Sequence, residues 1–112
     1  MSPSTKPQPL TPVVFHVLLA LGDGPLHGYA IMRRVEEESG IEMGPGTVYG
    51  SLDRLREMGW VEENEDDSGD RRRRRSFEMT REGRAGLEHE LARMKGLAEL
   101  ARRRGLAPRE AR

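Results

Sequence analysis

The segment from Gly44 to Gly59, GPGTVYGSLDRLREMG, is a short helix with both of its ends encoded in the sequence. Pro45 suits the first helical position, where a missing N–H leaves no hydrogen bond unmade. Gly59 suits the left-handed residue that follows the last turn. The apolar residues of the segment recur at i, i+4 and i+7, which predicts one buried face. This face consists of Val48, Leu52 and Leu55.

The opposite face of this helix is polar and rich in hydrogen-bond donors. It carries Thr47, Tyr49, Gly50, Asp53, Arg54 and Glu57. A helix with one anchored side and one polar side fits the major groove of DNA, where base edges present donors and acceptors. Helix-turn-helix proteins contact bases and phosphates from the N-terminal half of such a helix. We therefore expect DNA contacts at Thr47, Tyr49, Gly50, Ser51 and Arg54.

Each of these residues also has a purely structural interpretation. Thr47 lies in the first turn and suits a capping role, and Ser51 lies at the flank of the buried stripe. Tyr49 either packs back onto the domain or directs its hydroxyl to a phosphate. Arg54 offers its planar fork to a guanine or to a phosphate. Asp53 repels phosphates, so we expect it to be solvated or to orient Arg54.

Acidic and basic residues are strongly segregated in the second half of the chain. The formal net charge is zero, but binding a polyanion requires only a basic surface that faces the phosphates. Acidic side chains dominate from Glu62 to Asp70, and an arginine run, Arg71 to Arg75, follows directly. Alternate residues of a strand point to opposite faces, so only part of this run can meet DNA. We expect contacts with phosphates or a minor groove from Arg71, Arg72 and Arg73.

The remaining arginine of the run, Arg75, is expected to pair with an acidic neighbour. A less specific interpretation covers the whole run: a solvated strand whose charge is neutralised by the facing acidic strand.

Composition indicates one small domain inside the cell. A chain of 112 residues with 34% charged and 4% aromatic residues has a lean core, so a subunit interface is a natural source of extra stability. The chain contains no cysteine, which excludes disulfides and thiolate metal sites and fits a reducing cytoplasm. Its first residues lack the segments of a signal peptide, and the apolar run Val13–Leu21 is too short to span a membrane. We expect a cytoplasmic protein without membrane contact.

The order of the elements predicts a winged helix-turn-helix domain over residues 11–79, mostly α with a small β-hairpin. Residues 1–10 contain three prolines and are interpreted as a flexible arm. The elements expected after this arm are, in order, an apolar helix from Thr11 to Gly22, a turn at residues 23–26, a helix at about residues 27–39, the helix at residues 45–58, and a hairpin that begins at Trp60 and ends at Met79.

The last helix, expected over residues 80–105, carries an apolar seam longer than the small domain requires. Thr80 suits its N-cap, and Glu82 suits the positive end of its dipole. The seam has a 4-3-4-3 spacing, the roughly 3.5-residue period of a coiled coil. It consists of Leu87, Leu91, Met94, Ala98 and Ala101, widened by Leu97 and Leu100. Such a helix needs a partner, so we expect a homodimer with antiparallel or crossing helices, followed by a flexible tail at residues 106–112.

Three segments together have a recognisable pattern: HVLLALGDGPLHGYAIMRRVEEESG, GPGTVYGSLDRLREMGWVEE and RRRRRSFEMTREGRAGLEHELARM. Over roughly Pro12 to Arg104 the chain resembles a small PadR-type transcriptional regulator. The resemblance implies a homodimeric winged-helix repressor that binds a palindromic operator in double-stranded DNA. It also implies that the first and last helices build the dimer, at Val14, Leu18, Leu87, Leu91, Met94, Leu97, Ala98 and Ala101.

The resemblance further implies a possible small-molecule effector, since effectors in this family are diverse and often phenolic or drug-like. A cavity between the first and last helices would be lined by Phe15, Leu18, Leu91 and Met94, although a packed interface without ligand fits equally well. Two positions depart from the family pattern: many members have proline at Gly50 and tyrosine at Ser76. The last helix also lacks the tryptophan with which some relatives sandwich aromatic drugs.

The sequence contains no pattern typical of a metal site, a cofactor site or an enzyme. The three histidines lack metal-ligand spacing. The glycines at residues 44, 46 and 50 are spaced one residue too long for a dinucleotide loop and lack a βαβ unit. No acid–histidine–nucleophile set is evident. Trp60 is expected to anchor the core or an interface, with a ligand contact as the alternative.

Two other functions remain compatible with these patterns. The first is a winged-helix module that binds an acidic protein through its basic strand instead of binding a specific DNA sequence. The second is a dimer that only sequesters a ligand.

Overall fold

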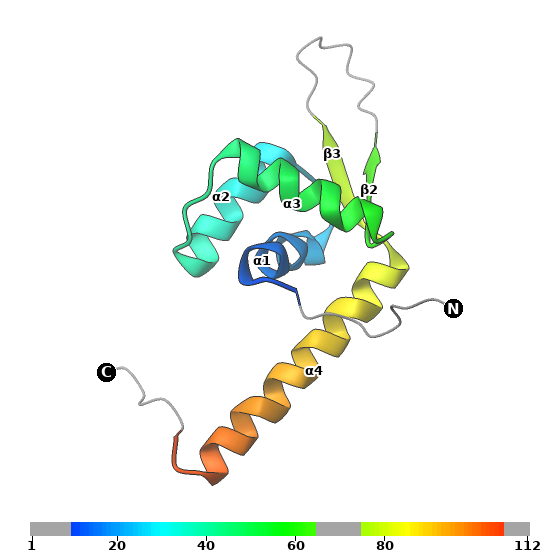
Figure 1. Cartoon of the computed structure of the whole chain (residues 1–112). Helices are drawn as coiled ribbons and strands as arrows, with labels where there is room; N and C mark the ends of the chain where they lie inside the picture. Colours follow the sequence, from blue (N-terminus) through cyan, green and yellow to red (C-terminus); the bar gives the residue numbers. More distant parts are fainter. Residues whose placement is uncertain (1–9, 65–74, 107–112) are drawn as a thin grey trace.

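The computed structural model describes residues 10–64 and 75–106. Three helices are followed by a hairpin and a long last helix, which confirms the predicted winged helix-turn-helix order (Figure 1). The elements are α1 (Pro12–Ala20), the 3₁₀ turn η1 (Leu21–Asp23), β1 (Leu26–His27), α2 (Gly28–Ser39), α3 (Pro45–Glu57), β2 (Val61–Asn64), β3 (Ser76–Met79) and α4 (Arg81–Arg103). None of the helices within these two ranges is long and apolar enough to cross a membrane.

Helix α1 is apolar on almost every side, and other elements cover it. The Thr11 hydroxyl caps its first turn by accepting a hydrogen bond from the Val14 N–H at 3.3 Å. Pro12 occupies the first helical position, where an N–H is not needed. Val17 and Leu18 have no exposed surface. Because α1 contacts α2, α3 and α4, its predicted position between layers is confirmed.

Helices α2 and α3 both end at a glycine in the left-handed conformation. Gly40 follows α2 with φ +78°, and Gly59 follows α3 with φ +80°. This conformation is unfavourable for residues with a Cβ. Helix α3 begins at Pro45 and ends at Glu57, with Met58 as its C-cap. The helix predicted from its two ends is therefore confirmed, one residue shorter than expected.

The inner face of α3 is completely buried. It consists of Val48, Leu52 and Leu55, none of which has exposed surface. They belong to one apolar cluster with residues of the first two helices and the sheet, including Val17, Ile31, Val35 and Phe77. Burying such a side chain contributes about 1.5–3 kcal/mol, so this cluster fixes the orientation of α3 about its own axis.

The sheet contains three antiparallel strands in the order β1-β3-β2. In the predicted hairpin, Val61 pairs with Met79, and Phe77 lies on the buried face with no exposed surface. Strand β1 was not predicted: residues 23–27 were assigned to a turn and the start of a helix, but Leu26 and His27 pair with β3. Two residues are too few to show the alternation of a strand, and their pairing depends on a partner far along the chain.

The start of α4 is joined to Gly59 and Trp60, the two residues before β2, by hydrogen bonds and close packing. The Thr80 hydroxyl accepts a hydrogen bond from the Gly83 N–H at 3.0 Å and donates one to the Gly59 carbonyl at 2.7 Å. The Thr80 N–H donates to the Trp60 carbonyl at 2.9 Å. A Cβ at Gly83 would collide with that carbonyl, and a Cβ at Gly86 would collide with the Trp60 ring. The predicted N-cap is confirmed, and the two glycines permit the close approach.

Beyond its first turns, α4 extends away from the other elements (Figure 1). Leu87 is still buried, but the next seam residues are exposed. Their exposed fractions are 42% for Leu91, 37% for Met94 and 51% for Leu97. The apolar seam predicted for this helix is thus an uncovered stripe in the single chain.

Helix α1 offers less surface than the sequence suggested. Leu18 has no exposed surface and lies in the core cluster. This burial gives no support to its assignment to the dimer interface or to the ligand cavity, because its side chain is enclosed by the core of its own chain. Val14 and Phe15 keep only 7% of their surface exposed.

The two ends of the chain fall largely outside the described residues. The expected N-terminal arm is represented only by Leu10, which is partly buried against the core instead of belonging to a free arm. The expected tail is represented only by Leu106, which is 67% exposed.

We predict that Gly83→Ala lowers the free energy of unfolding by about 1–3 kcal/mol, because the added methyl group has no space beside the Trp60 backbone. The matched control is Gly96→Ala on the same helix, where the added Cβ meets open space. Because alanine is the better helix former, this control is expected to add up to about 1 kcal/mol. Chemical denaturation measures both values, and equal effects would contradict the close contact of Trp60 with α4.

Candidate nucleic-acid interface

The outer face of α3 carries the residues predicted to contact DNA. Thr47, Gly50 and Arg54 are exposed, as the helical period of their neighbours requires. Ser51 is only 7% exposed and joins the buried side of the helix. This burial favours the structural interpretation of Ser51 over a contact with DNA, because the position at the flank of the stripe packs toward the core. The outer face of α3 carries no side chain at Gly50, and a Cβ added there would meet open space.

Tyr49 packs back onto the domain. Its ring lies edge-on to Phe77, with 6.0 Å between the ring centroids. Its hydroxyl approaches Gly28 so closely that a Cβ at Gly28 would collide with it. The Arg75 guanidinium lies 5.0 Å from the ring centroid of Tyr49, within the range of a cation–π contact. Of the two interpretations of Tyr49, these contacts favour packing over a phosphate contact.

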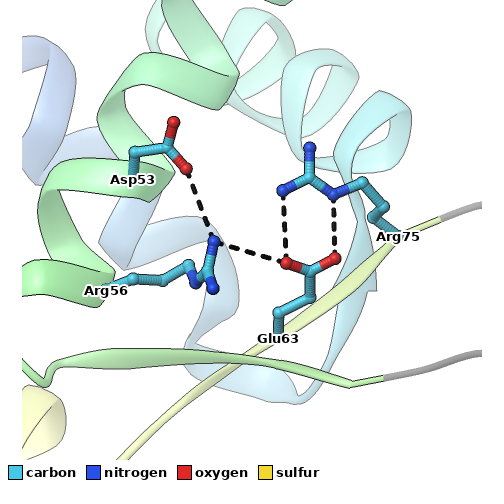
Figure 2. A network of polar contacts seen from close by, with 4 residues as sticks. All are labelled: Asp53, Arg56, Glu63 and Arg75. Atoms are coloured by element: carbon cyan, nitrogen blue, oxygen red, sulfur yellow. Dashed lines mark hydrogen bonds and ion pairs between the residues drawn. The ribbon is translucent and has the colours of Figure 1, made fainter.

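A chain of ion pairs joins α3 to the wing (Figure 2). Arg75 donates two hydrogen bonds to the Glu63 carboxylate, at 2.8 and 3.2 Å. Arg56 of α3 lies 3.4 Å from Oε1 of the same carboxylate, an oxygen that also accepts from Arg75, and 3.5 Å from Asp53. The predicted pairing of Arg75 with an acidic neighbour is confirmed. Asp53 pairs with Arg56, so the alternative in which it orients Arg54 receives no support from these contacts.

The electrostatics of this network follow from the two-pronged contact. The hydrogen bonds from Arg75 lower the pKa of Glu63, burial opposes this effect, and the charges of Arg75 and Arg56 add to it. The same hydrogen bonds raise the pKa of Arg75. A bidentate pair of this kind fixes geometry as well as charge. The network therefore sets the position of the wing strands relative to α3.

The wing arginines predicted to contact DNA, Arg71, Arg72 and Arg73, lie outside the described residues. The strands that lead to them, β2 and β3, rise beside α3 (Figure 1). The ion pairs described above join these strands to α3 through Glu63 of β2 and Arg75, the residue before β3.

Sequence reasoning missed a second exposed group at the start of α2. Tyr29 is 65% exposed, and the Arg33 guanidinium lies 6.0 Å from its ring centroid. Both residues line a hollow of about 660 Å³ that reaches Gly44 at the start of α3. Helix-turn-helix proteins place the helix before the recognition helix across the DNA backbone. The sequence pattern that could have revealed this group is an aromatic residue and an arginine at i and i+4 in the HGYAIMRR segment.

In the described part of the chain, no group of three or more histidine, aspartate or glutamate side chains has the geometry to hold a metal ion. The candidate interface thus consists of the outer face of α3, the start of α2 and the base of the wing. This combination defines the class of winged helix-turn-helix proteins.

Comparison with known families agrees with this class. The family described as "Transcriptional regulator PadR-like family" matches residues 17–89. The chain belongs to this family of transcriptional regulators.

Individual relatives match this chain at moderate sequence identity, and one of them is much longer than this chain. The chain is 46% identical over 83 residues to an uncharacterized 37.1 kDa protein in transposon TN4556 of Streptomyces fradiae; the match covers 71% of this chain and 23% of that protein. The chain therefore spans about a quarter of that relative. RosR of H. salinarum is 30% identical, with a TM-score of 0.67, over 80% of this chain and 77% of its own.

Two further structures share the fold. A PadR family transcription regulator from Clostridium difficile R20291 has a TM-score of 0.73 at 21% identity and covers 81% of this chain and 95% of its own. Bacillus subtilis PadR, solved in complex with operator DNA, has a TM-score of 0.64 at 23% identity and covers 70% of this chain and 46% of its own.

We predict a specific pH dependence for Glu63→Gln. Because the folded-state pKa of Glu63 is below its ordinary value of 4.5, its contribution is present above that value and is lost as the pH falls through the folded pKa. At neutral pH the variant should be less stable by about 1 kcal/mol, a discounted value for a partly exposed pair. The difference should vanish in acid.

Thermal unfolding from pH 7 to pH 3 measures this difference. The matched control is Glu62→Gln, which removes the neighbouring exposed carboxylate. If both variants had the same pH profile, the ion-pair network would not contribute to the fold.

Proposed function

We propose that this protein is a DNA-binding transcriptional regulator that acts as a homodimeric repressor in the cytoplasm. The observation that carries the proposal is the orientation of α3, whose inner face is completely buried and whose outer face presents Thr47, Gly50 and Arg54. Membership in a family of transcriptional regulators supports it. The complex of B. subtilis PadR with operator DNA supports it for the shared fold. A catalytic function has no support in the chemistry of this face.

Each subunit would insert α3 into a major groove. Thr47, Gly50 and Arg54 would face the bases, with Arg54 offering its fork to a guanine or a phosphate. Tyr29 and Arg33 at the start of α2 would lie against the DNA backbone, the position that the preceding helix takes in helix-turn-helix complexes. The wing residues Arg71, Arg72 and Arg73 would contact phosphates or the minor groove beside it.

The dimer would form along α4. Leu91, Met94 and Leu97 are exposed in the single chain, and large apolar side chains that line one side of a helix in this way favour an interaction surface. Ala98 and Ala101 continue it with small side chains that allow close approach. At the domain end, Leu87 and Val14 would lie at the margin of the interface. Two α3 helices would then be presented to a two-fold symmetric operator, as closed dimers bind palindromic sites.

Repression would follow from steric competition with RNA polymerase at the operator. A small molecule between the first and last helices, near Phe15, Leu91 and Met94, would shift the dimer to a geometry that binds DNA less well. Leu18 is not counted among the lining residues here, because the core encloses its side chain. Leu91 and Met94 remain accessible to a ligand in the single chain.

The alternative, a winged-helix module that binds an acidic protein, is favoured by one observation: the net charge of the chain is zero. Salt dependence separates this alternative from specific DNA binding. Duplexes selected from a random pool would be titrated over a range of salt concentrations. DNA binding through several phosphates makes log K fall with log salt at a slope near −0.9 per contact.

We predict that Arg54→Ala weakens binding to the selected duplex by about 1–3 kcal/mol and relaxes the preference at one base pair. The matched control is Arg102→Ala in the last turn of α4, which removes the same charge far from the outer face of α3. Fluorescence anisotropy measures both affinities. An Arg54 variant that binds all duplexes as tightly as the unchanged protein would contradict the assignment of α3 as the recognition helix.

We predict that Leu91→Asp combined with Met94→Asp converts the dimer to a monomer at micromolar concentration, because burying two unpaired carboxylates is costly. The control is Ala92→Asp, which adds a charge on the side of α4 away from the seam. Sedimentation velocity measures the mass. If both the double variant and the control were dimers, the interface would lie elsewhere. If the unchanged protein were a monomer, the proposed dimer would be excluded.

A further inference from the structure

A hollow outside the candidate interface lies where three elements meet. It is formed by the C-cap of α3, the residue before β2 and the first turns of α4, and it has a volume of about 490 Å³. Its lining is Met58, Trp60, Glu82, Ala85, Gly86, His89 and Glu90. Pockets for small molecules have volumes of about 300–1,000 Å³, so this hollow is large enough for a compound of one or two rings.

The aromatic wall of the hollow is held rigidly. The backbone N–H of Trp60 donates to the Leu55 carbonyl at 2.9 Å, and the backbone carbonyl of Trp60 accepts from the Thr80 N–H at 2.9 Å. The indole ring rests on Gly86, where a side chain would displace it. Trp60 is half-buried in this position, so one part of the ring packs against α4 and the rest remains available to a ligand.

The charges around the hollow favour a cation. Two carboxylates, Glu82 and Glu90, line it, and among the described residues that form its wall there is no lysine or arginine. Glu90 is only 7% exposed and pairs with Arg93 at 2.9 Å, which neutralises part of its charge. Glu82 makes no ion pair with any residue of the described ranges, so its charge remains available. An anionic ligand would meet the uncompensated carboxylate of Glu82 here.

The hollow lies at the flank of the apolar stripe of α4. With roughly 3.6 residues per turn, Ala85 and His89 point away from the side that carries Leu91 and Met94. Glu90, four residues before Met94, lines the wall of the hollow that adjoins the stripe.

We propose that this hollow binds an organic cation: a quaternary ammonium or amine that carries an aromatic ring. The charged group would lie over the face of Trp60, the strongest cation–π partner among the side chains, within reach of Glu82. The ring of the ligand would fill the apolar space beside Met58 and Ala85. Binding at this site does not require DNA or a second chain, so it is independent of the proposed function.

The chain offers a selective probe of this site, because Trp60 is its only tryptophan. The full chain would be titrated with benzyltrimethylammonium while NMR follows the indole N–H of Trp60. Benzyl alcohol, neutral, and phenylacetate, anionic, are the comparison ligands. We expect the cation to shift this resonance saturably below about 10 mM, the range for a ligand of this size, with roughly tenfold weaker binding of benzyl alcohol and none of phenylacetate.

The charge requirement is tested by Glu82→Gln combined with Glu90→Gln. We expect the affinity for the cation to fall at least roughly fivefold, while that for benzyl alcohol stays the same, because only the cation interacts with the carboxylates. The matched control is Glu88→Gln with Glu99→Gln, which makes the same change in net charge on exposed positions of α4 outside the hollow. If the double variant does not fold, Glu82→Gln alone gives the same comparison with a smaller loss.

Three results would overturn the proposal. The first is an unchanged Trp60 resonance at about 10 mM cation, the upper end of the range for this ligand size. The second is equal affinity for the cation and for benzyl alcohol. The third is an equal loss of cation affinity in the hollow variant and in the control.

Discussion

The burial of one side of α3 is the constraint on which the rest of the structure depends. Val48, Leu52 and Leu55 have no exposed surface, and each is enclosed by the cluster that also holds α1, α2 and the sheet. A helix anchored at three positions along its length cannot rotate about its axis without exposing apolar surface to water. Its polar face is therefore fixed outward. The function proposed for the protein is a consequence of this orientation.

The wing is joined to this helix by contacts between side chains. Tyr49 packs on Phe77 of β3, Arg75 covers the Tyr49 ring, and the Glu63 carboxylate joins Arg75 to Arg56 of α3. Each contact is modest alone, since partly exposed ion pairs contribute about 1 kcal/mol or less. Together they make the positions of the wing and of α3 depend on each other. A similar junction, built by Gly83 and Gly86 against Trp60, fixes α4.

The sequence was most informative where local chemistry and period agree. Proline and glycine mark the ends of α3, and Thr80 marks the start of α4, because these features act within one turn of the chain. Strand β1 could not be predicted, since its two residues form a strand only by pairing with β3. The burial of Leu18 and Ser51 could not be predicted for a related reason. In a helix that is apolar all round, or at the edge of a stripe, only the packed neighbours determine which side is enclosed.

The central claim is that two copies, joined by α4, present two α3 helices to one face of a duplex. Hydroxyl-radical footprinting on a selected duplex tests it most directly. The claim predicts two protected segments related by two-fold symmetry, about 10 base pairs apart or a multiple of this distance, on the same face of the DNA. A single protected segment, or uniform protection along the duplex, would contradict it.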